Sequence, residues 1–165
     1  MNKIILGIDP GTATTGFGVV KDNKGQVEYV DCGCIVTTKG VPSAERLLTI
    51  QKSLEVLIEK YKPEIVAVEK LFFTKNITTA ISVAEARGVI LVTAAEHNLE
   101  IAEYTPLQVK QTLTGYGKAG KQQMQRMVKT ILNLQDIPKP DDAADALAIA
   151  ICAIHHSANI KAQVD

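Results

Sequence analysis

Four acidic residues fall at the ends of predicted strands and at the start of a predicted helix, where their side chains could act together. Asp9 ends an apolar strand just before Pro10, and Glu69 ends another strand. Asp142 and Asp145 lie three residues apart in the first turn of the last predicted helix, so they share a helix face. Carboxylates at the ends of adjacent central strands, with a helix N-terminus nearby, could meet at one edge of the sheet.

A cluster of carboxylates without softer ligands suits Mg²⁺ or Mn²⁺, which prefer hard anionic oxygen and keep several waters. Two such ions, about 3.5–4 Å apart, can activate a water and stabilise the leaving oxygen when a phosphodiester is cleaved. We therefore expect Asp9, Glu69, Asp142 and Asp145 to be both catalytic and metal-binding. The expected cofactor is Mg²⁺, with two ions in each site and Mn²⁺ as a substitute.

Each of these acids could also have an explanation that involves no chemistry. Asp141 could be a helix N-cap, and acids in a first helical turn are favoured by the helix dipole, which could account for Asp142. Glu69 could be a surface charge, since a lysine follows it. Asp145 is harder to explain in this way because it interrupts an apolar run. Asp9 is harder still, because a strand-terminal aspartate before Pro-Gly lies at the interior edge of a sheet.

The elements that must position these acids follow from apolar periodicity and turn residues. The sequence predicts a mixed five-stranded α/β sheet with helices on both faces, in one domain over residues 1–157 with a disordered tail over 158–165. The predicted strands are 3–9, 17–21, 27–37, 65–68 and 101–104. The predicted helices are 43–61, with Ser43 as N-cap, 78–97, 106–113, 121–132 and 141–155.

The predicted helix over 78–97 is apolar on nearly every side, which indicates a helix buried all round. In a domain this small, a second copy of the chain could supply that burial, and the alternative is burial in the domain's own core. For a dimer, the expected contact residues include Ile81, Ala84, Val89 and Val92.

The composition, 46% hydrophobic and 22% charged residues among 165, is that of an ordinary globular protein. No apolar run could span a bilayer or form a signal-peptide core, so we expect a cytoplasmic protein with no membrane partner. Cys32, Cys34 and Cys152 have neither disulfide nor zinc-finger spacing and are expected to be buried reduced thiols. His97 and the pair His155-His156 show no ligand spacing.

The net charge is zero, but residues 106–140 hold six Lys or Arg and one acid, a net charge of +5 that leaves −5 elsewhere. A basic surface beside a carboxylate site suits an enzyme that acts on nucleic acid, although a solvated helix face is the alternative. Lys118 and Lys121 lie among glycines in a loop that could reach backbone phosphate. Phe72 and Phe73 fall in a polar loop and could stack on splayed bases, unless one of them packs into the core.

Five segments together resemble the RuvC family of bacterial Holliday junction resolvases. In order from Leu6 to Ile151, they are LGIDPGTATTGFGVV, VAVEKLFFTKN, EARGV, QVKQTLTGYGKAGKQQM and DDAADALAIAI. The resemblance covers nearly the whole chain, and its most specific parts are the QVKQ segment and the last motif.

The resemblance implies a ribonuclease-H-like fold and a homodimer that nicks two opposing strands of four-way junction DNA with Mg²⁺. It implies catalytic roles for the four acids, with Asp142 the least settled because some members have histidine there. It also implies that Lys110 and Lys121 handle the junction, that Phe72 acts at the junction centre, and that RuvA and RuvB are partners. Lys110 lies on a predicted helix and is expected to contact DNA further from the cut than Lys121.

Other classes share parts of the pattern. Actin-like ATPases, chaperone ATPases and sugar kinases begin with a similar tract but need two lobes to close on ATP, which 165 residues do not supply. A ribonuclease-H-like nuclease acting on RNA or other branched DNA, such as one that processes pre-ribosomal RNA, is a closer alternative. A non-catalytic nucleic-acid binding module would keep the basic segment but would not need four convergent acids.

Overall fold

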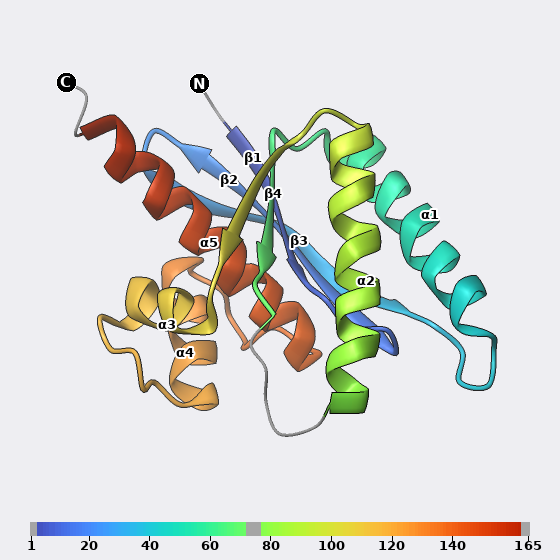
Figure 1. Cartoon of the computed structure of the whole chain (residues 1–165). Helices are drawn as coiled ribbons and strands as arrows, with labels where there is room; N and C mark the ends of the chain where they lie inside the picture. Colours follow the sequence, from blue (N-terminus) through green and yellow to red (C-terminus); the bar gives the residue numbers. More distant parts are fainter. Residues whose placement is uncertain (1–2, 72–76, 163–165) are drawn as a thin grey trace.

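The structure is a computed structural model that describes residues 3–71 and 77–162. Its centre is a mixed sheet of five strands in the order β3-β2-β1-β4-β5 (Figure 1). The strands are β1 Lys3–Asp9, β2 Thr14–Asn23, β3 Gln26–Val36, β4 Ile65–Glu69 and β5 Glu100–Tyr104. β1 lies in the middle, antiparallel to β2 and parallel to β4, and β5 is parallel to β4. The predicted five-stranded mixed sheet is therefore confirmed.

Helices cover both faces of this sheet, as expected (Figure 1). α1 and α2 lie on one face, and α5 crosses the other face with α3 and α4 beside it. The helices are α1 Ser43–Tyr61, α2 Ile77–Glu96, α3 Pro106–Thr114, α4 Lys121–Ile131 and α5 Asp141–Ala162. No helix within the described part of the chain is long and apolar enough to cross a membrane.

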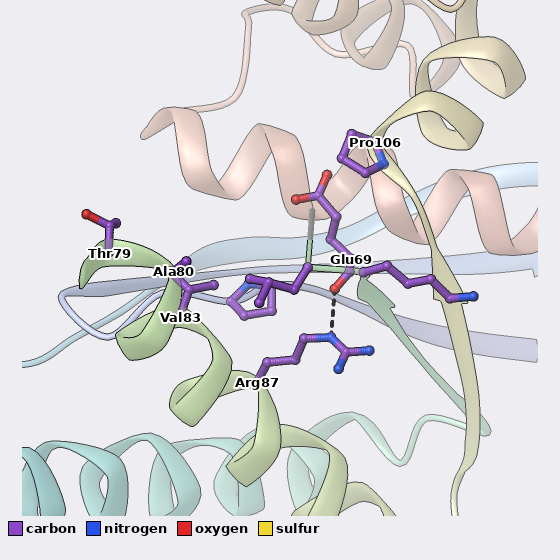
Figure 2. A pocket seen from close by; sticks show the side chains of 9 residues that line it. Glu69, Thr79, Ala80, Val83, Arg87 and Pro106 are labelled. Atoms are coloured by element: carbon purple, nitrogen blue, oxygen red, sulfur yellow. Dashed lines mark hydrogen bonds between the residues drawn. The ribbon is translucent and has the colours of Figure 1, made fainter. Parts of the chain in front are cut away.

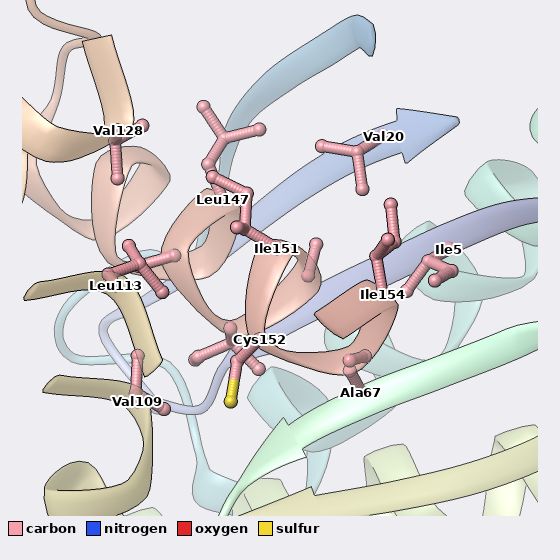
Figure 3. Packing of buried hydrophobic residues seen from close by; sticks show 14 of the residues in the cluster. Ile5, Val20, Ala67, Val109, Leu113, Val128, Leu147, Ile151, Cys152 and Ile154 are labelled. Carbon is pink, nitrogen blue, oxygen red and sulfur yellow. The ribbon is translucent and has the colours of Figure 1, made fainter. Parts of the chain in front are cut away.

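Two apolar cores result from the alternation of side chains along the central strands. Leu6 and Ile8 of β1 point to one face and pack with residues of α1 and α2, whereas Ile5 packs on the other face. Figure 3 shows this second core, in which Leu147 and Ile151 of α5 lie between the sheet and the residues of α3 and α4. The long apolar α5 is buried because it lies between these two layers.

Several details differ from the sequence predictions. α1 begins at Ser43 as expected, but its N-cap is Pro42, and no side chain caps it. β2 begins at Thr14, three residues earlier than predicted, because it pairs with β3 along its whole length. α5 continues to Ala162, beyond the predicted end at 155. Cys152 is buried, but Cys32 and Cys34 are only half-buried because β3 is an edge strand.

α2 is not buried all round within the protomer. Ala86, Ile90 and Ala94 are fully buried on its inner side. The opposite side carries an exposed stripe, which we call the α2 outer stripe: Ile81, Ala84, Gly88 and Val92. Ile81 and Val92 are each 57% exposed. Burial of the whole helix in the domain's own core is therefore wrong for this chain.

Candidate active site

Two of the acids meet because β1 and β4 are adjacent parallel strands. The register between the two strands pairs Ile8 with Val68, so Asp9 and Glu69 are the next residues on each strand. Parallel strands end at the same edge of a sheet, so the two carboxylates leave the sheet side by side. Both side chains are half-buried.

α5 brings the other two acids to this edge by lying directly on the sheet. A Cβ on Gly16 of β2 would collide with the backbone oxygen of Asp142, and a Cβ on Gly18 would lie 2.6 Å from the nitrogen of Leu147. Gly7 of β1 is equally close to the backbone of α5. These three glycines remove the side chains that would otherwise hold the helix away, and the first turn of α5 therefore reaches the end of β1.

A pocket of about 240 Å³ lies where these elements meet. Three acids line it, Asp9, Glu69 and Asp145, together with Lys110 and Lys121. Its other walls are formed by residues of α3, α4 and α5, which include Val109, Met124 and Ile149. Asp142 does not line the pocket. The pocket therefore combines concentrated negative charge with two lysines, one of which, Lys110, lies nearer to the acids than expected.

The acids in this pocket hold their protons unusually tightly. Burial, together with the charges of Glu69, Asp145 and Asp142, raises the pKa of Asp9 to about 8, and Lys121 opposes this shift. Burial also raises the pKa of Glu69 to about 7, with repulsion from Asp145 adding to the effect and Lys110 opposing it. The pKa of Asp145 is raised by burial as well. Neighbouring carboxylates that resist ionisation form a site at which a bound cation would relieve the repulsion between their negative charges.

Lys121 is the cation nearest to the acids on α5. Its Nζ lies 3.0 Å from Oδ2 of Asp141 and 3.8 Å from Oδ2 of Asp145. Asp141 also accepts a hydrogen bond of 2.9 Å from Nε2 of Gln125. Asp141, which could have been an N-cap, lies instead in the first turn of α5. Its side chain holds Lys121 over the pocket. This role could not be predicted from the sequence because it depends on the packing of α4 against α5.

The donor set suits a hard divalent cation, since it consists of carboxylate oxygens with raised proton affinity. Within residues 3–71 and 77–162, however, no three His, Cys, Asp or Glu side chains already surround a single point as metal ligands would. The carboxylates of the described residues therefore do not yet converge on one point. Ion binding would therefore require these side chains to turn toward the ion.

None of the other described residues singled out in the sequence lines this pocket. Lys118 is exposed and does not line the pocket. Phe72 and Phe73 lie outside the described residues. His97 and His155 are exposed. His156 contacts Oγ1 of Thr112 through Nε2 and packs edge-on against the ring of Tyr104.

Comparison with known proteins places this site in a family. The profile of the family described as Crossover junction endodeoxyribonuclease RuvC matches residues 5–153. A relative with that name from Pelotomaculum thermopropionicum is 54% identical over 153 residues, which cover 93% of each chain. Another, from Caldicellulosiruptor saccharolyticus, is 51% identical over 162 residues, which cover 98% of each chain.

The fold is also similar to solved structures. Thermus thermophilus RuvC in complex with Holliday junction substrate matches with a TM-score of 0.89 and 35% identity, over 95% of this chain and 96% of that one. A second structure of T. thermophilus RuvC matches with a TM-score of 0.86 and 36% identity, over 94% of this chain and 96% of that one. The ribonuclease-H-like fold is thereby confirmed, and the chain belongs to the RuvC family of crossover junction endodeoxyribonucleases.

Proposed function

We propose that this chain resolves four-way DNA junctions by paired nicks, in the cytoplasm, during recombination and repair. The observation that carries this proposal is the pocket in which Asp9, Glu69 and Asp145 lie beside Lys110 and Lys121. The family is named for cutting crossover junctions, and its T. thermophilus member has been solved with a Holliday junction. A nucleic-acid binding module without activity would not need a group of half-buried acids whose pKa values are raised by burial and by one another's charges.

The acids would act as ligands of two Mg²⁺ ions, for which Mn²⁺ could substitute. Asp9 and Glu69 would hold the ions from the edge of the sheet, and Asp142 and Asp145 would hold them from α5. When bound, the ions would supply Lewis acidity at the phosphate and an activated water for the cut. The expected products carry 5′-phosphate and 3′-hydroxyl ends.

The lysines would hold the negatively charged DNA at this pocket. Lys110 and Lys121 line it and can contact phosphates close to the cut, whereas the exposed Lys118 would contact the backbone further away. Phe72 and Phe73 would stack on bases at the junction centre. Because Lys121 already pairs with Asp145, DNA phosphate would compete with Asp145 for Lys121, and a cation would compete with Lys121 for Asp145.

A homodimer would provide the second cut. The exposed α2 outer stripe includes Ile81, Ala84 and Val92, three of the four residues expected at the interface. Val89, the fourth, is half-buried and packs partly against α1 and the sheet. By resemblance, RuvA and RuvB would be the partners that bring the dimer to a junction.

A synthetic four-way junction tests this proposal directly. We expect nicks in the junction with Mg²⁺, none in EDTA, no response to ATP, and much slower cutting of a linear duplex. Asp145→Asn should abolish cutting while gel-shift binding persists, because binding depends mainly on contacts between Lys or Arg and phosphate. Asp136→Asn, at an exposed acid away from the pocket, is the matched control and should cut normally. Equal cutting of duplex and junction, or full activity in EDTA, would contradict the proposal.

A further inference from the structure

One arginine of α2 holds the backbone beside a proposed metal ligand. Nε of Arg87 donates a hydrogen bond of 3.1 Å to the carbonyl oxygen of Glu69, as Figure 2 shows. The N–H of Lys70 donates a hydrogen bond of 2.7 Å to the carbonyl oxygen of Tyr104 on β5. The Glu69 carbonyl and the Lys70 N–H belong to the same planar peptide unit. That unit is therefore held at both of its polar groups.

The same guanidinium is fixed from a second direction. Nη2 of Arg87 forms an ion pair with Oε2 of Glu103 on β5, and only 19% of the arginine side chain is exposed. A planar guanidinium can donate to two partners in fixed directions, which a lysine ammonium cannot reproduce. Arg87 therefore joins α2, the end of β4 and β5 at one point.

The end of β4 needs this support because its pairing with β1 has stopped. The ladder between the two strands ends at Ile8 and Val68. Pro10, which follows Asp9, has no N–H with which to extend it. The carbonyl of Glu69 thus relies on Arg87, a side-chain donor from another element.

We propose that Arg87 is a positioning residue, which aims the Glu69 carboxylate by fixing the peptide unit that follows it. This inference rests on the proposed function, in which Glu69 is a metal ligand. Groups that orient metal ligands typically change metal affinity or activity about 10- to 100-fold when they are lost. Arg87 lies on α2, the helix that carries the α2 outer stripe. A shift of α2 would therefore also move Arg87 and, through its hydrogen bond, the backbone of Glu69.

Arg87→Lys is the variant that separates the positioning of the Glu69 backbone from the positive charge of the side chain. Lysine keeps a positive charge near Glu103 but cannot hold both Glu103 and the Glu69 carbonyl in the arginine geometry. Glu103→Gln is the matched control, because it removes the ion pair and leaves the Nε donor in place. Two readouts need neither DNA nor cutting: hydrogen exchange at the Lys70 amide, and Mn²⁺ affinity measured by electron paramagnetic resonance.

For Arg87→Lys, we expect exchange at Lys70 to be about five- to tenfold faster, as loss of one hydrogen bond implies. Mn²⁺ binding should weaken about tenfold or more, while the melting temperature and junction affinity stay near wild type. Glu103→Gln should show a smaller change in both readouts. Wild-type exchange and Mn²⁺ affinity in Arg87→Lys would overturn the inference. Equal acceleration of exchange in β1 and β4 would overturn it too, because the role would then be general stability.

These readouts also separate this inference from the proposed function. If the wild-type protein fails to cut junctions, the proposed function fails, yet Lys70 exchange and Mn²⁺ affinity still report on Arg87. If the wild type cuts and Arg87→Lys matches it in both readouts, only the role of Arg87 is wrong.

Discussion

At the scale of single residues, the main feature of this site is a group of carboxylates that burial and mutual repulsion keep from ionising. The pKa of Asp9 is raised from 3.8 to about 8 and that of Glu69 from 4.5 to about 7, in both cases mainly by burial. Between these values the folded chain keeps protons that the unfolded chain has released. Without a cation, folding stability must therefore fall as the pH rises from about 4 to 8.

Asp9→Asn should remove much of this pH dependence, because asparagine has no proton to lose. In EDTA at pH 8, we expect the variant to melt at least about 2 °C above wild type, the shift that roughly 1 kcal/mol produces in a chain of this size. The difference should shrink at pH 5. Thermal unfolding followed by circular dichroism at both pH values measures it, with Asp136→Asn as the exposed control. A wild type that gains stability from pH 5 to 8 in EDTA would show that the acids do not repel one another in this way.

The two lysine positions should differ in what they contribute. Lys121 lies within 3.8 Å of Asp145, so in the proposed function its charge would act on the phosphate that is cut. Lys121→Ala should lower turnover at saturating enzyme by about 10²–10³-fold, the usual cost of losing one stabilising donor. Lys118→Ala should mainly weaken junction binding. It should also reduce the slope of the binding constant against salt concentration by about 1, the value for one lost phosphate contact. Single-turnover cutting and binding at several salt concentrations distinguish these effects. Unchanged turnover in Lys121→Ala would show that Lys121 contributes only to DNA binding and not to the cutting step.

Residue types and positions along the chain predicted that Asp9, Glu69 and Asp145 lie close together, but they did not predict all of the neighbours of these acids. Asp9 and Glu69 could be found because strand ends are visible in the apolar pattern. Asp141 and Arg87 could not, because their partners come from other elements and only packing brings them together. The nearness of Lys110 to Glu69 was missed for the same reason.

At the scale of elements, the site depends on how closely α5 approaches the sheet. β1 and α1 were predicted with the observed bounds because their apolar periodicity is strong. The start of β2 was missed because Thr14 and Gly16 lack the apolar alternation of a strand. Gly16, which hides the start of this strand in the sequence, also helps to create the space for α5.

Gly16→Ala tests this close approach. The added Cβ would meet the backbone of Asp142, which cannot move without moving the first turn of α5. We expect a loss of stability of roughly 1–3 kcal/mol, as in other overpacked sites, and a strong loss of cutting. Gly120→Ala is the control, because a Cβ there meets nothing within 4 Å at an ordinary φ of −78°. Urea unfolding measures the stability, and wild-type stability and cutting in Gly16→Ala would contradict the packing described.

At the scale of the whole molecule, the proposed dimer through the α2 outer stripe would turn one nicking site into a resolving pair. A closed two-fold dimer places two identical sites about one axis, which matches the near two-fold symmetry of a four-way junction. The sequence predicted an apolar α2 but could not show which side the domain buries. The structure leaves Ile81 and Val92 each 57% exposed on the outer side.

Ile81→Asp should separate the protomers without unfolding them. The side chain is exposed in the protomer, so aspartate is tolerated there, but in a dimer it would be buried near the axis without a partner. Sedimentation velocity should show a dimer for wild type and a monomer for Ile81→Asp. Leu48→Asp, at an apolar residue of α1 that is 47% exposed, is the control and should stay dimeric. An Ile81→Asp protein that remains dimeric would exclude this stripe as the interface.

The central claim is that two copies of the acid pocket cut one junction together, and a plasmid that extrudes a cruciform tests it most directly. Two cuts within the lifetime of one complex convert the supercoiled plasmid to a linear product, whereas independent single cuts give nicked circles. We predict that the wild-type protein with Mg²⁺ gives mainly linear plasmid and that Asp9→Asn leaves the plasmid supercoiled. Nicked circles as the main wild-type product, or linear plasmid from Asp9→Asn, would contradict it.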